Sequence, residues 1–276
     1  MSRRWLDGRW AKRLMLLAAL PATVGAEALS SWELGSRRCL EVVEQGPGVS
    51  DIERHCAEAL RQAEQAGIRN ARVAAMMDRL GGIYLRQGRL AEAERLSRAE
   101  LGIREQLPGE SHAAFIERIR QQAALFWSRG GYAYAESLYR RVLAIHQKKP
   151  GQQEGAMARS TNDLALLLWN QGRYGEAEPL FRRALAIEEK RLGPDHPGVA
   201  AAANNLAVLC EQSGRLEEAE ALYHRSLEIR EKALGPHHPE VIGSLNNLVL
   251  FYRTQGKAAE ADRYANRVAA ASRKPR

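Results

Sequence analysis

Apolar residues recur every three or four positions through most of the chain, the pattern of helices that bury one face. Around residue 214 the pattern changes phase, which indicates two consecutive helices. Gly214 lies between them and suits the left-handed conformation that ends a helix. The buried sides are expected to hold Ala203, Leu206, Ala207 and Cys210 in the first helix, and Leu216, Ala219, Tyr223, Ser226 and Leu227 in the second. This segment is therefore predicted to form a helix hairpin.

The same hairpin pattern returns at a fixed interval. Gly88, Gly130, Gly172, Gly214 and Gly256 are each 42 residues apart. They open five related blocks, GRLAEAERL, GGYAYAESL, GRYGEAEPL, GRLEEAEAL and GKAAEADRY. A constant period of this length indicates an array of one supersecondary unit.

Short connectors are expected between the hairpins. LGPDHP from Leu192 and LGPHHP from Leu234 each hold a glycine that ends a helix and a proline that cannot continue it. The second proline of each connector, Pro197 or Pro239, suits the first turn of the next helix. A less regular first hairpin is predicted near residues 29–44 and 50–66, which brings the total to six.

These motifs together are similar to a known family. Asn-Asn-Leu-Ala, the Gly-Arg-x-x-Glu-Ala-Glu-x-Leu-Tyr block and Gly-Pro-x-His-Pro resemble tetratricopeptide repeats of the 42-residue kinesin light chain type. The resemblance covers residues 155–270 closely and 70–154 more loosely. It implies an all-α fold, a right-handed α-solenoid of stacked helix hairpins.

The N-terminus has the composition of a signal peptide. A basic opening, MSRRWLDGRWAKR, precedes the short apolar run LMLLAAL and the small residues Val24-Gly25-Ala26, after which cleavage is expected. An ordinary first helix remains the alternative. The domain prediction is a signal peptide at 1–26, a degenerate hairpin at 27–69, five repeats at 70–272 and a basic tail at 273–276. The mature chain would be exported, to the periplasm or outside the cell.

Charge and cysteine content narrow the functional classes. The full chain has a formal net charge of +8, and the five basic residues and Asp7 in residues 1–26 account for +4 of it. The remaining net charge of +4 is too small to indicate nucleic-acid binding. Cys39 and Cys56 lie about equally far from the Gly46-Pro47-Gly48 break, so a disulfide between them is geometrically reasonable, and two small buried side chains are the alternative.

One face of each first helix is left over for a partner. Positions opposite the buried side of the Gly214 hairpin, moved along the chain by 42 residues, should line the concave surface of the array. The candidate groove residues are Arg79, Arg120, Trp127, Arg159, Asn162, Trp169, Asn170, Asn204, Asn205, Glu211, Asn246, Asn247 and Arg253.

The residue types on this face favour peptide binding. An asparagine side chain both donates and accepts, so a row of asparagines can pair with the backbone of an extended peptide. Trp127 and Trp169 add flat apolar anchors. The alternative is that the asparagine row merely solvates the helices. We predict a non-enzymatic scaffold that holds an extended peptide or a partner helix in the concave groove.

Other functional classes find less support. The chain has no Gly-rich phosphate loop, no His-Glu-x-x-His and no Gly-x-Ser-x-Gly, so no catalytic residue is predicted. His112, His196 and His238 belong to different repeats, too far apart to share an ion, so neither a metal nor a small-molecule cofactor is expected. Two alternatives stay open: a self-associating envelope component, and a cytosolic adaptor if the N-terminus is not a signal. The partner and the oligomeric state are not predicted.

Overall fold

The computed structural model describes residues 32–40, 49–109, 111–148 and 154–273. The predicted signal peptide at 1–26, its cleavage site and most of the tail from 273 to 276 lie outside these residues. Every regular element within the described ranges is a helix, and none of these helices is long and apolar enough to cross a bilayer. The chain divides into two compact units, one ending at Phe115 and one beginning at Ile116.

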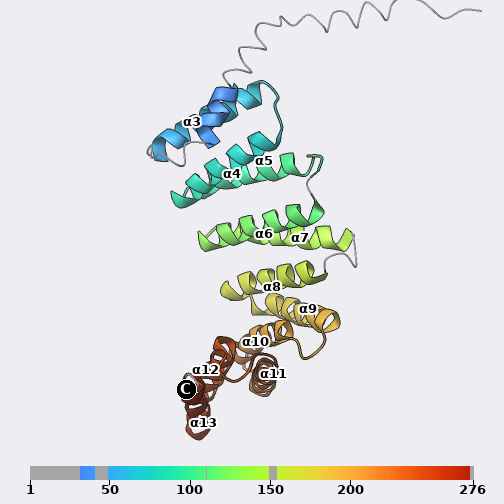
Figure 1. The fold of residues 1–276 in the computed structure, drawn as a ribbon, viewed down its shortest axis with the longest axis vertical. Helices are drawn as coiled ribbons and strands as arrows, with labels where there is room; N and C mark the ends of the chain where they lie inside the picture. The colour runs from blue at the N-terminus through green and yellow to red at the C-terminus, as the bar shows by residue number, and fades with distance from the viewer. Residues whose placement is uncertain (1–31, 41–48, 110, 149–153, 274–276) are drawn as a thin grey trace, which may run out of the picture. The chain divides into compact units, whose positions relative to one another are not determined.

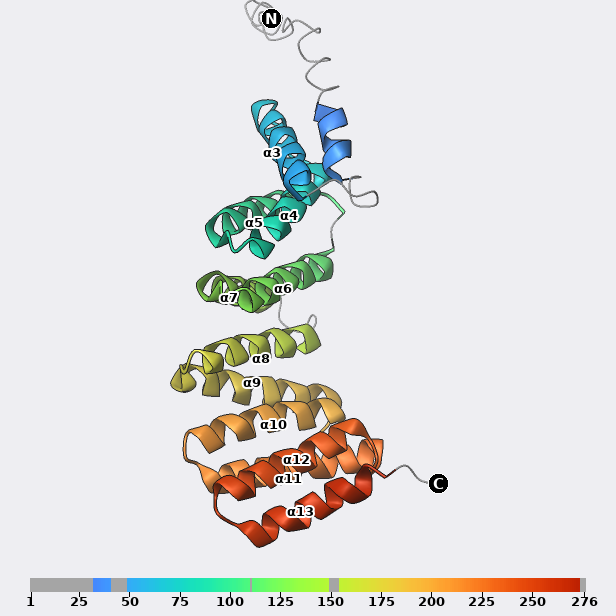
Figure 2. The ribbon, with the colours of Figure 1, turned by 90° about the vertical axis from the view of Figure 1, so that its left-hand side faces the viewer.

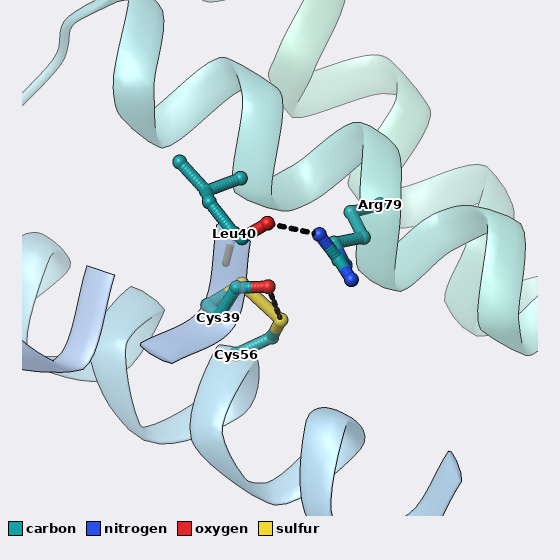
Figure 3. The surroundings of a disulfide bond; sticks show 4 residues. All are labelled: Cys39, Leu40, Cys56 and Arg79. Atoms are coloured by element: carbon teal, nitrogen blue, oxygen red, sulfur yellow. Dashed lines mark hydrogen bonds between the residues drawn. A yellow bond between two sulfur atoms is a disulfide. The ribbon is translucent and has the colours of Figure 1, made fainter. Parts of the chain in front are cut away.

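The first unit holds a helix over residues 32–40, α3 (Val49–Gln65), α4 (Ala71–Arg86) and α5 (Leu90–Arg104). A disulfide joins Cys39 to Cys56, with an S–S distance of 2.07 Å, and so ties the first of these helices to α3. Figure 3 shows that Arg79 of α4 also reaches this helix, where it donates to the carbonyl oxygen of Leu40 at 2.6 Å. Cys39 and Cys56 are fully buried.

The second unit consists of hairpins that follow one another as layers (Figures 1 and 2). The boundary between the units falls inside α6 (His112–Ser128). The remaining helices are α7 (Tyr132–Lys148), α8 (Glu154–Asn170), α9 (Tyr174–Leu192), α10 (Pro197–Gln212), α11 (Leu216–Leu234), α12 (Pro239–Thr254) and α13 (Ala258–Ala271). From α7 to α13, each helix packs on the next one along the chain.

Backbone geometry explains where these helices end. Gly214 has φ 74°, and the amide of Arg215 donates back to the carbonyl of Cys210 at 2.9 Å. A residue with a side chain would be strained at this φ, so glycine closes the helix at the least cost. The repeating glycines at 88, 130, 172 and 256 adopt the same conformation. The sequence-based prediction of their role is confirmed.

The predicted packed side of α10 is also confirmed. Ala203, Leu206, Ala207 and Cys210 are all at most 1% exposed. On α11, Ala219 and Tyr223 are buried as well. Small alanines let the paired helices approach closely, while Leu206 and Tyr223 fill the space between layers. This packing fixes which side of each first helix remains open.

Candidate binding groove

Asparagines of successive first helices are bonded to one another. Asn205 of α10 donates its side-chain amide to Asn162 of α8 at 2.9 Å, and Asn247 of α12 donates to Asn204 of α10 at 2.7 Å. Each bond joins residues 43 positions apart, so the second asparagine of one repeat meets the first asparagine of the repeat before it. We refer to the surface formed by Asn162, Asn204, Asn205, Asn246 and Asn247 as the asparagine face.

The bonding pattern leaves defined groups unused. Within the described residues, the side-chain amides of Asn162 and Asn204 donate to no other group, and the side-chain oxygens of Asn205 and Asn247 accept no bond. These four side chains are half-buried, and Asn246 is exposed. An asparagine amide has two donor hydrogens and an oxygen with two lone pairs. The face therefore presents donors and acceptors that are already held in position.

At the α6 end the corresponding positions are charged and paired. Arg120 of α6 donates to Asp163 of α8 at 2.6 Å and to Glu117 at 2.8 Å. Burial raises the pKa of the Asp163 carboxyl, more than the bond to Arg120 lowers it. Arg120, a predicted groove residue, is therefore engaged within the protein and is only 15% exposed.

The tryptophans lie on the same helices, toward their C-terminal ends. Trp127 and Trp169 are half-buried, and the ring nitrogen of Trp169 donates to the side-chain oxygen of Gln212 on α10 at 2.8 Å. One repeat later, Glu211 occupies the position of Trp169, and it accepts from Thr254 on α12 at 3.3 Å. A second row of contacts between repeats thus runs parallel to the asparagine pairs.

A hollow of about 420 Å³ opens beside this second row, between α10 and α12. Its apolar wall includes Val208 and Leu250, and Leu250 is 62% exposed. Glu211 and Tyr223 contribute polar atoms, and the Tyr223 hydroxyl donates to the Glu211 carboxylate at 2.8 Å. The hollow is large enough to receive a side chain of a bound partner.

The remaining predicted groove residues are dispersed. Arg159, Asn170 and Arg253 are exposed, and their side chains form no hydrogen bond or ion pair with another described residue. Arg79 belongs to the first unit, where its guanidinium bonds the Leu40 carbonyl, and burial lowers its pKa. The structure brings together Asn162, Asn204, Asn205 and Asn247 directly, whereas Arg79 contributes to the packing of its own unit.

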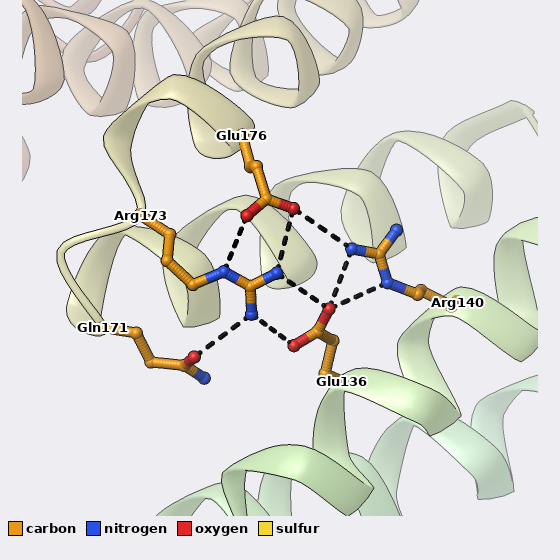
Figure 4. A network of polar contacts seen from close by, with 5 residues as sticks. All are labelled: Glu136, Arg140, Gln171, Arg173 and Glu176. Atoms are coloured by element: carbon orange, nitrogen blue, oxygen red, sulfur yellow. Dashed lines mark hydrogen bonds and ion pairs between the residues drawn. The ribbon is translucent and has the colours of Figure 1, made fainter.

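An ion-pair network stands out on the second helices, and the sequence reasoning did not anticipate it. Arg173, which follows Gly172, donates to Glu136 of α7 at 2.6 Å and to Glu176 of α9 at 2.8 Å (Figure 4). The Arg173 side chain holds the pKa of Glu136 below its ordinary value. The signal was present in the repeated Gly-Arg and Ala-Glu pairs, because Arg215 pairs with Glu178 over the same separation of 37 residues. Arg89 pairs with Glu53 in a similar way, although Glu53 follows an isoleucine.

A comparison with protein families agrees with this architecture. The family model described as Tetratricopeptide repeat matches residues 72–148, 156–223 and 199–274. The chain belongs to the tetratricopeptide repeat family. The matches cover most of the described chain, including the asparagine face.

Solved structures of tetratricopeptide proteins share the fold at low sequence identity. BtubC (BKLC) from P. vanneervenii is 20% identical, with a TM-score of 0.60 over 84% of this chain and 95% of that one. A putative kinesin light chain from Podosopora anserina with TPR-like repeats is 23% identical, with a TM-score of 0.51 over 75% and 97%. A Rap protein complexed with competence and sporulation factor is 13% identical, with a TM-score of 0.52 over 91% and 77%. A search of curated proteins finds no match.

The tetratricopeptide connectors give the histidines a role. His196 and His238 precede α10 and α12, and their Nδ1 atoms accept from the backbone amides of Gly198 at 3.0 Å and Glu240 at 3.2 Å. Each imidazole thus caps a helix.

Nowhere in the described part of the chain do three or more His, Cys, Asp or Glu residues gather so that they could hold a metal ion. Burial raises the pKa of the Cys210 thiol, which favours a packing role.

Proposed function

We propose that this tetratricopeptide protein is a non-enzymatic scaffold that binds an extended segment of a protein partner along the asparagine face. The observation that carries the proposal is the pairing of asparagines between repeats. An extended peptide offers one donor and one acceptor per residue, and the unused amide and carbonyl groups of the face match both. A bond to backbone needs no particular partner side chain, so this part of the surface supplies affinity and leaves selection to its neighbours.

The fold and the exposed apolar positions support the same proposal. Tetratricopeptide repeats serve as interaction scaffolds, and a Rap protein of similar fold is known in complex with competence and sporulation factor. Trp169, on the same helix as Asn162, and Trp127, on α6, are half-buried, so part of each ring stays open to a partner. Rigid aromatic side chains contribute much contact area for little loss of side-chain entropy.

The experiment replaces Asn204 and Asn246 with alanine in one variant. Twelve-residue peptides displayed on phage are selected on the 276-residue chain, and the affinity of synthetic copies is then measured by fluorescence anisotropy. We expect the variant to keep its helicity and to lose about tenfold in affinity, the value of one or two hydrogen bonds. Asn266→Ala, at an exposed position of α13, is the matched control. Unchanged affinity of the variant for every selected peptide contradicts the proposal.

Export belongs to the same proposal. The pattern of residues 1–26 supports it, and the disulfide between Cys39 and Cys56 suits an oxidising compartment. Intact mass of the chain purified from its own cell fractions tests this. We expect a chain that begins at Glu27, with Cys39 and Cys56 open to alkylation only after reduction. A chain that keeps Met1 and has three free thiols overturns export.

A further inference from the structure

The hollow between α10 and α12 has an unusual charge distribution. Of the residues that line it, Glu211 alone bears a charge, and the others are apolar or neutral polar side chains. Within the described chain no ion pair joins Glu211 to any arginine or lysine, and Arg253, the neighbouring cation on α12, is exposed. Glu211 is half-buried and has no side chain of opposite charge bonded to it among the described residues.

The position of this carboxylate is fixed from two sides. One oxygen accepts from the Tyr223 hydroxyl at 2.8 Å. The other lies 3.3 Å from the Thr254 hydroxyl, whose single hydrogen is shared with the Phe251 carbonyl oxygen at 2.8 Å. Burial raises the pKa of Tyr223, and the Glu211 carboxylate raises it further, so this tyrosine remains a neutral donor. A carboxylate has about four lone-pair positions, so each oxygen retains room for another bond.

The walls of the hollow suit a long basic side chain. Val208 and Leu250 offer apolar surface at its edge, and the exposed Leu250 has no cover of its own. Lysine and arginine place their aliphatic stems on apolar surface and extend their charged ends to a carboxylate. The side-chain oxygens of Gln212 and Thr254 add further acceptors beside Glu211.

We propose that this hollow binds a lysine or arginine side chain of the extended segment that lies on the asparagine face, with Glu211 as the residue that determines this preference. The inference rests on the proposed function, since the segment must first lie along the face.

The spacing of the helices predicts where the basic residue occurs in the partner. Glu211 takes the position on α10 that Trp169 takes on α8, one repeat earlier. Side chains of α8 and α10 bond each other directly, as in helices about 8–10 Å apart, and an extended chain advances about 3.3 Å per residue. A residue that contacts Trp169 and a residue that enters the hollow are therefore about three positions apart. The expected partner pattern is an apolar residue followed, or preceded, by lysine or arginine at that interval.

The experiment compares peptide selection on three forms of the 276-residue chain. Phage-displayed twelve-residue peptides are selected on the wild type, on Glu211→Gln and on Glu217→Gln, which alters an exposed glutamate of α11. We expect the wild type and Glu217→Gln to enrich lysine or arginine three positions from an aromatic or aliphatic residue. Glu211→Gln should lose this enrichment and bind the wild-type peptides roughly tenfold more weakly. Circular dichroism melting checks that the variants remain folded.

The possible outcomes separate the two proposals. Peptides that depend on Asn204 and Asn246 but show no basic preference, or an acidic one, overturn the role of the hollow and leave the scaffold proposal intact. A basic residue whose contribution survives Glu211→Gln likewise overturns it. Peptides that bind independently of the asparagines contradict the proposed function itself. Moving the basic residue by one position in a synthetic peptide tests the three-residue interval, and an unchanged affinity overturns that interval.

Discussion

Arg173 shows how a single side chain can connect two consecutive hairpins. Its guanidinium bonds Glu136 of the preceding hairpin and Glu176 of α9, the helix that Arg173 directly precedes (Figure 4). Because Arg173 lowers the pKa of Glu136 in the folded chain, ionised Glu136 stabilises the fold above its unfolded pKa. This stability is lost as the pH falls through the lowered, folded-state pKa.

Glu136→Gln should therefore be destabilising at neutral pH and nearly neutral in acid. The side chains of Glu136 and Arg173 are 17% and 33% exposed, so we expect a loss of about 1 kcal/mol at pH 7. Urea unfolding at pH 7 and at about pH 2, below the lowered folded-state pKa, measures the difference. Glu228→Gln, at a largely exposed intrahelical pair with Lys232, serves as the control and should change little. A loss that is equal at both pH values would contradict the electrostatic explanation.

Side-chain pairing was the part of the site that sequence reasoning could not reach. Periodicity correctly grouped Asn162 with Asn204 as equivalent positions. The bonds, however, join Asn162 to Asn205 and Asn204 to Asn247. The bonded residues are 43 rather than 42 positions apart because one helix is inclined to the next. The repeat period of the sequence carries no information about that angle. The same offset links Trp169 to Gln212.

At the scale of the helix, glycines with different backbone conformations should respond in opposite ways to the same substitution. Gly214 has φ 74° at the end of α10, whereas Gly243 lies inside α12. An added Cβ would meet no heavy atom within 4 Å at either position. We expect Gly214→Ala to lower the free energy of unfolding by about 1 kcal/mol through backbone strain. Gly243→Ala should raise it by roughly 0.5–1 kcal/mol, since alanine is the better helix former.

Thermal and urea unfolding of both variants measure these effects. A loss at both positions would mean that the glycines are selected for space rather than for conformation.

Glycines that end helices also explain why helix boundaries were predictable from sequence. Gly193 and Gly235 end α9 and α11, and Pro197 and Pro239 begin the helices that follow. The first hairpin carries weaker signals, and its connecting residues 41–48 lie outside the described chain.

At the scale of the whole molecule, the two units differ in what holds them together. The second unit repeats its packing and its arginine pairs from hairpin to hairpin, so its stability is close to a sum over neighbours. The first unit carries the disulfide between Cys39 and Cys56, which closes a loop over a sequence separation of 17. Such a crosslink contributes about 3 kcal/mol by restricting the unfolded chain. The hydrogen bond from Arg79 to the Leu40 carbonyl also connects α4 to the helix over residues 32–40.

Reduction should therefore weaken the first unit and spare the second. We expect a thiol reductant to speed amide hydrogen exchange in residues 32–40, α3 and α4, and to leave α10 and α12 unchanged, because Cys210 of α10 is already a free, buried thiol. Hydrogen exchange followed by mass spectrometry resolves these segments in one measurement. In a double variant with Cys39→Ala and Cys56→Ala, the reductant should have no effect, and α3 should exchange as quickly as in the reduced wild type. Faster exchange in α10 and α12 on reduction would show that the crosslink supports the repeats beyond its own unit.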